Sequence, residues 1–317
     1  MEISLRSSLE ADVASEGAIV VPGRLLVDLA RLLPSDDVSI EHRPGEGIVE
    51  IVSGTASYKL HTYNAEDFPR LPEVSAAPLV AVDAEAVLET TGKVSRAASR
   101  DESRPVLTGI LVRFEGDRLV MAATDSYRLA VKETQLEAGG LELDAIVPAR
   151  ALGELTRIAQ GGDELHLGVQ ENQVLFATDG VLLTTRRIEG QFPNYRQLLP
   201  EAFEHELTLP RDEALDVVRR VSVMAQRNAP LRLRFAEGEL TVSAQTQDVG
   251  EARETLPVPF AAEPLEIGFN PEFLRDGIES IAGDEVRMKL ISPLRPAVLQ
   301  GEGDDFSYLI MPIRLAG

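Results

Sequence analysis

The side chains that could perform chemistry are scattered along this sequence rather than gathered in a motif. No metalloprotease, esterase, phosphate-loop or dinucleotide-binding motif occurs. Ser126 follows Asp125 but has no histidine close by in the sequence to act as its base. The four histidines lie far apart in the sequence, at positions His42, His61, His166 and His205. We therefore predict that the chain has no catalytic residues and is not an enzyme.

An acidic loop and the lack of cysteine bear on metal binding. Gly301-Glu302-Gly303-Asp304-Asp305 could hold a cation, but it lacks the alternating ligand spacing of a calcium loop. A hairpin turn is the favoured interpretation. The chain has no cysteine, which removes disulfides, thiolate catalysis and cysteine-based zinc sites together. We expect no metal and no cofactor.

Cationic side chains recur on the stretches with helical periodicity. They are Lys93, Arg96 and Arg100 on one predicted helix, Arg219, Arg220 and Arg227 on another, and Arg24, Arg31, Arg150 and Arg157 on two helices of related sequence. Acidic residues gather elsewhere, in 133–144, 163–171, 201–216 and 251–266. Two interpretations remain open: a basic face toward phosphates, or solvated helix faces whose cations suit the helix dipole. A third related helix goes against a basic face, because Arg275 is outnumbered by Glu272, Asp276 and Glu279.

Two apolar stretches have the composition of binding surfaces. One is Thr124-Asp125-Ser126-Tyr127-Arg128-Leu129-Ala130 and the other is Tyr308-Leu309-Ile310-Met311-Pro312-Ile313-Arg314-Leu315. The second is either a last core strand or, because methionine adapts to irregular partners, the wall of a pocket.

Composition indicates a large globular protein. The chain has 317 residues, of which 44% are hydrophobic and 26% charged, enough for two or three domains. No basic-then-apolar leader and no run of 18 apolar residues occurs, so we expect no membrane partner and a cytoplasmic location. The net charge of −21 argues against nucleic acid, unless the cations line an inner face.

One sequence pattern occurs three times. An apolar strand (18–21, 145–147, 265–269) leads into a helix that starts at Pro22, Pro148 or Asn270-Pro271, and alternating strands follow an acidic marker. The markers Asp36, Asp163 and Asp284 lie 127 and 121 residues apart, the size of a domain rather than of a solenoid repeat. Apolar residues recur in each predicted helix at the spacing of one helix face, so we predict that the chain consists of several copies of one module.

A second type of unit lies between the copies. Residues 79–131 read as a strand, a helix over 84–99 and three strands; residues 206–257 read as the same order with a helix over 212–226. Both unit types are β-α-β-β-β, and one of each makes a domain, which predicts an α+β fold with helices on one face of antiparallel sheets. The predicted domains are 1–74, 75–200 and 201–317.

The first copy has no partner unit before it. Its opening residues 2–11 match only the last strand of such a unit. We therefore expect residues 1–74 to be the C-terminal half of a domain, with an open sheet edge.

Four sequence segments carry a resemblance to a known family: Arg104-Pro105-Val106-Leu107-Thr108-Gly109, Thr124–Ala130, Phe192-Pro193-Asn194-Tyr195-Arg196 and Met311-Pro312-Ile313-Arg314-Leu315. Together with the repeat plan, they make the whole chain resemble the bacterial DNA polymerase III beta subunit, the sliding clamp. The resemblance implies a head-to-tail homodimer that encircles duplex DNA and tethers the replicative polymerase. Sliding needs phosphate contacts without sequence reading, which a helix-borne positive potential supplies.

The resemblance also implies three sets of site residues. A pocket for a short linear motif of the polymerase, the clamp loader and repair polymerases would be lined by Leu107, Thr124, Ser126, Tyr127, Arg128, Leu129, Pro193, Gln197, Leu198, Pro296, Leu309, Met311, Pro312 and Ile313. The DNA channel would be lined by Arg24, Lys93, Arg96, Arg150, Arg157, Arg219 and Arg220. The ring would close between Tyr58 and Leu60 of one protomer and Val223 and Met224 of the other.

The half-domain at the start leaves an alternative. We expect weakened or absent ring closure for the chain as written, or a cropped start. The alternative function is a peptide-binding module that keeps the pocket but never closes a ring.

Overall fold

The computed structural model describes residues 2–69, 78–137, 139–162, 164–170, 172–225, 229–247, 250–301, 303 and 305–315. The chain divides into two compact units: Ser8–Ser75 with Met1, and Glu2–Ser7 with Ala76–Gly317. The predicted boundary at 74/75 and the repeat marker Asp163 lie outside the described residues.

The first unit packs one helix against a three-stranded antiparallel sheet. Its elements are α1 (Gly23–Ala30), β2 (Val38–Arg43), β3 (Ile48–Ser53) and β4 (Ala56–His61), with strand order β2-β3-β4 and short 3-10 turns η1 (Pro44–Glu46) and η2 (Ala65–Asp67). Leu26 and Leu29 lie one helical turn apart, so both reach the small core around Val49, Ile51 and Leu60.

The second unit contains three sheets and, within the described residues, four α-helices. The helices are α2 (Ala84–Ser95), α3 (Ala149–Ile158), α4 (Arg211–Ser222) and α5 (Pro271–Ser280). The five-stranded sheet has the order β1 (Ile3–Ser7), β12 (Val181–Arg186), β11 (Gln173–Thr178), β10 (Glu164–Gln170), β5 (Val80–Asp83). The eight-stranded sheet has the order β13 (His205–Pro210), β18 (Glu285–Leu290), β19 (Ala297–Gln300), β20 (Phe306–Ile310), β8 (Arg128–Gln135), β7 (Arg118–Thr124), β6 (Gly109–Phe114), β9 (Asp144–Pro148). The four-stranded sheet has the order β16 (Gly250–Pro257), β15 (Glu239–Thr246), β14 (Leu231–Ala236), β17 (Leu265–Phe269).

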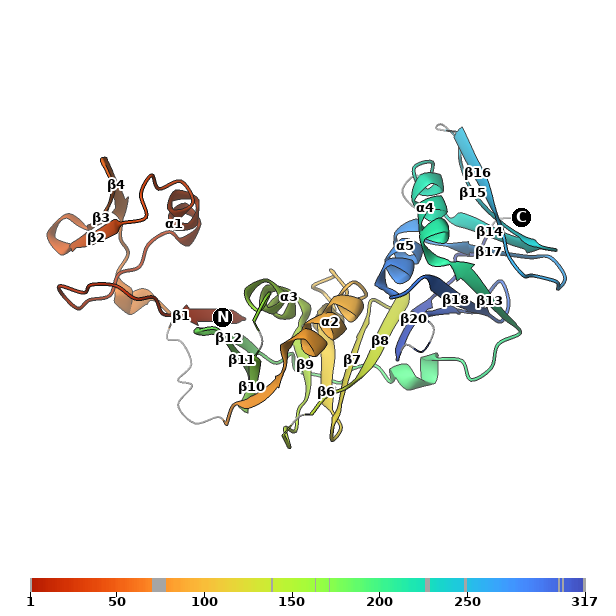
Figure 1. The fold of residues 1–317 in the computed structure, drawn as a ribbon, viewed down its shortest axis with the longest axis horizontal. Helices are drawn as coiled ribbons and strands as arrows, with labels where there is room; N and C mark the ends of the chain where they lie inside the picture. The colour runs from red at the N-terminus through yellow and green to blue at the C-terminus, as the bar shows by residue number, and fades with distance from the viewer. Residues whose placement is uncertain are drawn as a thin grey trace. The chain divides into compact units, whose positions relative to one another are not determined.

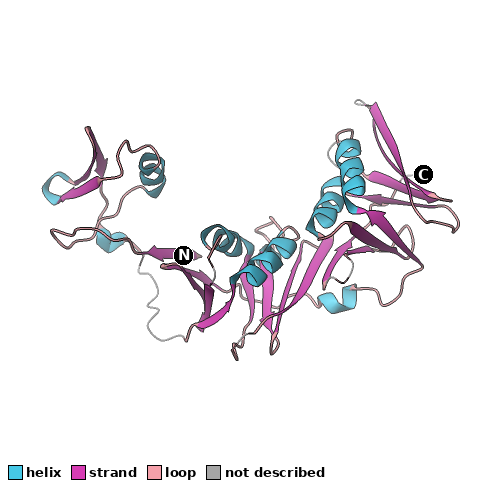
Figure 2. Cartoon of the chain, in the orientation of Figure 1, coloured by secondary structure: helices cyan, strands magenta, loops and turns pink. Residues whose placement is uncertain are grey.

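The helices of this unit share one side of the strands (Figures 1 and 2). Helix α2 contacts α3 and α5, and α5 contacts α4. The short 3-10 turns η3 (Pro105–Thr108) and η4 (Tyr195–Leu198) belong to connecting segments. This arrangement confirms the predicted α+β fold with helices on one face of antiparallel sheets.

Local sequence explains where the helices begin. The Asn270 side chain accepts hydrogen bonds from the backbone N–H groups of Glu272 and Phe273, at 2.9 and 3.2 Å, and so caps α5. Pro22 and Pro148 precede their helices as cap residues instead of forming the first helical position. Helices α2 and α4 end earlier than predicted, at Ser95 and Ser222, with backbone turns after each.

Two equivalent seams join the repeated units into continuous sheets. At one seam β20 pairs antiparallel with β8, with Tyr308 opposite Ala130 and Leu309 opposite Leu129. At the other seam β12 pairs antiparallel with β1. In both seams the last strand of one unit type pairs with the last strand of the other. Strand β1 is shorter than the predicted match over 2–11, but it does take the place of the last strand of a unit of the second type.

The predicted strand over 18–21 is wrong. Among the described residues this segment makes only an isolated bridge between Val20 and Tyr63. Its counterparts β9 and β17 pair with β6 and β14 of the other unit type. The first unit offers no such neighbour within the described residues, and a strand needs ladder partners for its backbone groups.

Candidate functional site

The seam between β8 and β20 gathers several of the predicted pocket residues. Leu129 and Leu309 face each other in a buried cluster, and the Met311 N–H donates a 2.8 Å hydrogen bond to the Tyr127 carbonyl. Tyr127 is exposed and Met311 partly so, which leaves both able to contact a ligand. The C-terminal stretch 308–315 combines the two predicted alternatives, because it is a core strand up to Ile310 and an accessible segment from Met311 onward.

A tight turn over Thr124–Arg128 presents the exposed Tyr127 side chain. The Asp125 carboxylate accepts the backbone N–H groups of Tyr127 and Arg128, and Thr124 donates its hydroxyl to the Arg128 carbonyl at 2.6 Å. Ser126 has φ = 82°, a left-handed conformation that costs free energy for a residue with a Cβ atom. The Asp125-Ser126 pair thus shapes the turn that carries Tyr127.

Arg128 is buried and bonded inside the protein. Its guanidinium contacts Asp276 of α5 at 2.6 Å and Asp125 at 3.0 Å, and lies 4.2 Å from the Phe273 ring centre. Burial would lower the pKa of Arg128, but Tyr308, Asp276 and Asp125 outweigh it and raise that pKa. Burial in turn raises the pKa of the Tyr308 hydroxyl, which donates to the Phe273 carbonyl at 2.9 Å. This network ties the seam to the helices.

The other predicted pocket residues lie in connecting segments. Leu107 is in η3, Pro193 precedes η4, Gln197 and the exposed Leu198 end η4, Pro296 precedes β19, and Pro312 follows Met311. Ile313 contacts a different sheet, because its N–H donates a hydrogen bond to the Gly268 carbonyl of β17. The structure thus brings the seam residues into contact and leaves Ile313 beside the neighbouring sheet.

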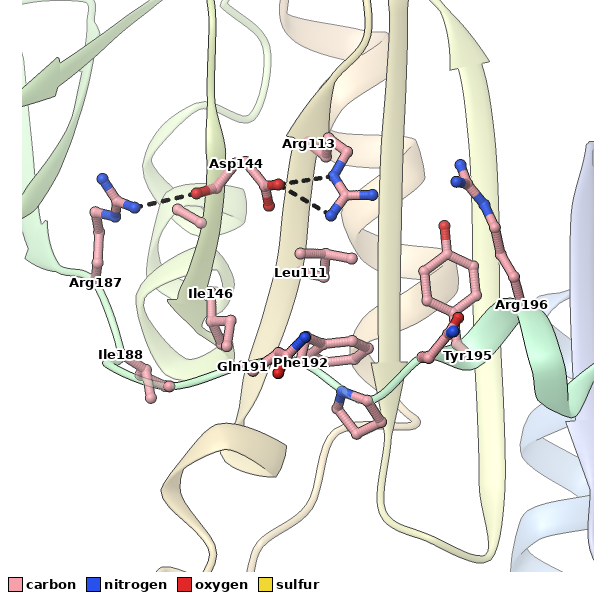
Figure 3. Close-up of a pocket in the computed structure, with 14 residues that line it drawn as sticks. Leu111, Arg113, Asp144, Ile146, Arg187, Ile188, Gln191, Phe192, Tyr195 and Arg196 are labelled. Carbon is pink, nitrogen blue, oxygen red and sulfur yellow. Dashed lines mark hydrogen bonds and ion pairs between the residues drawn. The ribbon is translucent and has the colours of Figure 1, made fainter.

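A cavity of about 470 Å³ lies where the connector that contains Phe192 and Tyr195 crosses the sheet (Figure 3). Arg113 and Asp144 form a 3.0 Å ion pair in its lining, and Arg187 donates to the Asp144 carbonyl. Its apolar lining includes Leu111, Ile146, Ile188 and Phe192, and the other labelled side chains are Gln191, Tyr195 and Arg196. Of the predicted pocket residues only Pro193 lines it.

Sequence reasoning missed this cavity, although the connector motif Phe192-Pro193-Asn194-Tyr195 marked its location. Phe192 and Tyr195 are buried in the cluster that contains Leu129 and Leu309. The buried Tyr195 hydroxyl has no hydrogen-bond partner among the described residues. Two aromatic residues beside a proline in a connector were the available signal that the segment is anchored to the sheet.

The predicted channel cations differ in their surroundings. Arg150 is exposed on α3, and Arg157 is exposed with Glu154 at 3.4 Å. Arg96, at the end of α2, and Arg219, on α4, both bond to Glu279 of α5. Arg24 is exposed on α1 of the first unit.

Lys93 and Arg220 also pair with acidic side chains. The Lys93 side chain is only 11% exposed, pairs with Glu89 at 3.2 Å and lies over the Phe306 ring. Arg220 forms a two-pronged contact with Glu254 of β16, at 2.7 Å for the shorter ion pair, and points toward that edge strand. Both are therefore weaker candidates for phosphate contact than Arg150 and Arg157.

The predicted interface residues lie at element edges. Tyr58 and Leu60 are on β4, and Leu60 is buried in the core of the first unit. Val223 ends α4 and is 76% exposed, whereas Met224 packs partly against the core of the second unit. Val223 is thus the interface candidate that offers the most apolar surface.

Among the residues that the structure describes, no group of histidine, aspartate and glutamate side chains could hold a metal ion. No helix in that part of the chain is long and apolar enough to span a membrane. The predicted acidic loop joins the antiparallel strands β19 and β20, as a hairpin would, although Glu302 and Asp304 lie outside the described residues.

Solved structures of sliding clamps share this fold over nearly the whole chain. A DNA polymerase sliding clamp from Caulobacter crescentus superposes with a TM-score of 0.91 at 28% identity, covering 99% of this chain and 86% of that one. The clamp from Bacillus subtilis gives a TM-score of 0.90 at 26% identity, with 99% and 87% covered. The fold is therefore that of the sliding clamps.

Sequence comparison identifies the family. Models of the N-terminal, central and C-terminal domains of the DNA polymerase III beta subunit match residues 1–72, 81–194 and 196–314. The beta sliding clamps of Streptomyces coelicolor and Synechococcus elongatus are each 34% identical, over 100% and 99% of this chain and 87% and 86% of their own lengths. The chain belongs to the DNA polymerase III beta subunit family, and its function is that of a DNA sliding clamp in replication.

Proposed function

We propose that this chain forms a head-to-tail homodimeric ring around duplex DNA, with its helices toward the DNA and the β8–β20 seam as the docking site for partner proteins. We propose three domain regions in each protomer, with 1–74 as the C-terminal half of the first domain, 75–200 as the second and 201–317 as the third. The chain then acts as a non-catalytic processivity subunit in the bacterial cytoplasm, on the nucleoid. The observation that carries this proposal is the repeated seam between strands.

The two seams inside the chain predict a third one between chains. Strand β12 pairs with β1, and β20 pairs with β8, always last strand to last strand. The remaining strands of these two kinds are β4 and β16, and each ends its sheet within the described residues. If β4 of one copy pairs with β16 of another, two copies close a ring by a heterologous contact.

The register of this third seam follows from the first two. By strand register, Tyr58 of β4 is equivalent to Tyr308 of β20, and Ala252 of β16 is equivalent to Ala130 of β8. Tyr308 and Ala130 lie opposite each other in the β8–β20 seam. Transferring that pairing sets Tyr58 of one copy opposite Ala252 of the other, and Lys59 opposite Glu251. Opposite charges directly across an antiparallel pair favour the contact. Val223, which follows α4 and is 76% exposed, then supplies apolar contact to Tyr58. Leu60 and Met224 pack mainly within their own units and support these two residues from behind.

The helices suit a sequence-independent contact with DNA. Arg150 and Arg157 on α3 are exposed and can reach phosphates without reading bases. The acidic remainder of the protein, within a net charge of −21, repels DNA from other surfaces. Topological linkage in turn retains the protein on DNA without tight binding, as a tether does.

The seam suits a short peptide with apolar anchors. Tyr127 and Met311 flank a buried floor of Leu129 and Leu309. Arg128 is bonded to Asp276 and Asp125, so we assign it to positioning the turn instead of contacting the peptide. Apolar anchors with a few polar groups are the usual composition of such a site, here for the polymerase, the clamp loader and repair polymerases.

One experiment separates the ring from the alternative of a peptide-binding module without a ring. The chain is loaded by its clamp loader onto nicked circular DNA, and the DNA is then linearised. A ring should remain on the circle and be lost from the ends of the linear form. Retention that does not depend on circularity would contradict topological linkage. The comparisons lend the alternative no support, since the chain matches 86–87% of the length of the relatives named above.

A further inference from the structure

Helix α5 reverses the charge that its repeated counterparts carry at the same positions. Counting from the first residue of each helix, Glu279 takes the ninth position of α5, where α3 has Arg157 and the segment of α1 has Arg31. The second position shows the same reversal, with Glu272 where α3 has Arg150. The proposed DNA-facing helices therefore include one that carries acid where its relatives carry base.

Glu279 is bonded to two arginines from two other helices. One carboxylate oxygen bonds to Arg219 of α4 at 2.8 Å, and the other bonds to Arg96 at the end of α2. Arg96 is also 3.8 Å from Asp276, one turn earlier on α5. The two arginine side chains remain about half exposed, whereas Glu279 is 19% exposed. Arg219 in turn is 3.8 Å from Asp216 on its own helix. Both cations are thus accessible to solvent, and Glu279 is the carboxylate that bonds to both.

A carboxylate in this position resembles a DNA phosphate to the arginines. It offers one anionic oxygen to each of two guanidinium groups, and phosphate oxygens are acceptors of the same kind for arginine. A phosphate must displace Glu279, or share the arginines with it, before either cation adds to DNA affinity. Each arginine that stays bonded to Glu279 is one cation fewer that can neutralise a DNA phosphate and release its counterions.

We propose that Glu279 is an internal counter-charge that keeps Arg96 and Arg219 from binding DNA phosphates tightly, and so weakens the grip of the clamp on duplex DNA. This inference rests on the proposed function, because it requires the helices to face DNA. Its effect is to favour sliding, since retention comes from the closed ring and not from affinity.

The test measures binding of the full chain to a linear duplex by fluorescence anisotropy across a salt series. Glu279→Gln keeps the size of the side chain and removes its charge. We expect tighter binding, with the slope of log Kd against log salt steeper by about one to two, at ~0.9 for each new phosphate contact. Between 1 M and 0.1 M salt, each new contact then adds about eightfold in affinity.

Glu272→Gln is the matched control on the same helix. It removes the same unit of charge, but no ion pair of Glu272 is recorded among the described residues. A gain for Glu279→Gln no larger than that for Glu272→Gln would overturn the inference. A lower melting temperature with an unchanged salt slope would also overturn it, because Glu279 would then only staple the helices together.

Arg150→Ala separates the failure of this inference from failure of the proposed function. Arg150 is an exposed channel candidate, and no contact with Glu279 is recorded for it. If Arg150→Ala weakens DNA binding while Glu279→Gln does not strengthen it, only the role of Glu279 is wrong. If neither substitution changes binding, the DNA-facing role of the helices is itself wrong.

Discussion

Replacing Arg128 should destabilise the second unit far more than replacing an exposed arginine. Arg128→Met keeps much of the apolar stem but leaves Asp276, 8% exposed, without its 2.6 Å partner. Removing one partner of a buried ion pair costs about 3–5 kcal/mol when the other charge stays buried and uncompensated. Asp276 keeps longer contacts with Arg275, at 3.4 Å, and Arg96, at 3.8 Å, so we expect the lower end of that range, about 3 kcal/mol. For a unit of this size, that corresponds to a melting temperature lower by about 6–12 °C.

Thermal unfolding followed by circular dichroism measures this effect, with Arg113→Met as the control. Arg113 pairs with Asp144, whose side chain is 62% exposed, so its loss should cost at most about 1 kcal/mol. Adding Asp276→Asn to Arg128→Met should recover part of the loss, since no unpaired buried charge then remains at α5. If Arg128→Met lowers the melting temperature no more than Arg113→Met does, the network does not support the seam and the reasoning fails.

Three further predictions address the interface, the pocket and pH. Lys59→Glu should weaken the homodimer, and adding Glu251→Lys should restore it, because opposite charges across a strand pair contribute about 0.2–1 kcal/mol; sedimentation equilibrium showing no recovery would contradict the register. Met311→Ala and Tyr127→Ala should each weaken binding of a peptide carrying the partner motif by about tenfold, the loss of an anchor residue, and unchanged anisotropy titrations for both would remove them from the pocket. Burial would raise the pKa of Glu279, but hydrogen bonds from its two arginines outweigh it and hold that pKa below its ordinary 4.5. The stability that Glu279 adds over Glu279→Gln should therefore be constant from pH 7 to about pH 5 and disappear as pH falls through the lowered pKa; a difference that grows on acidification would refute this.

The repeated elements were predictable because their signals are local. Asn270 caps α5 through its own neighbours, and the spacing of Leu26 and Leu29 on α1 orients one helix face. The strands from Gly109–Phe114 onward alternate or run apolar in the manner of sheet residues. Such signals depend on residues within one or two turns of each other, so a single sequence contains them.

The contacts that build the site were not predictable, because they join distant residues. Arg128 and Asp276 are 148 residues apart in the sequence, and Arg96 and Glu279 are 183 apart. A list of charged residues shows which cations exist but not which acid holds each one. The resemblance to the family supplied Arg128 and Arg96 as site residues, yet the structure shows each bonded to an acid on α5.

The segment 18–21 shows the same limit for strands. Its apolar sequence has strand propensity, and its counterparts at β9 and β17 do form strands. What differs is the neighbour, since β9 and β17 each pair with a strand of the other unit type. Strand propensity therefore indicates a candidate strand at 18–21, but whether a strand forms depends on whether a neighbouring strand is available to pair with it.

The free edges of β4 and β16 connect the fold to the proposed ring. An exposed edge strand presents unpaired backbone groups that invite pairing with any other chain. Strand β16 carries Glu251, Arg253 and Glu254 along its length, and charges of this kind disfavour pairing with an unrelated apolar edge. Lys59 of β4 faces Glu251 only in the register of the two internal seams, so the same charges that block random pairing admit this one. The strand-pairing geometry that the chain uses twice internally is therefore the one that we propose between chains.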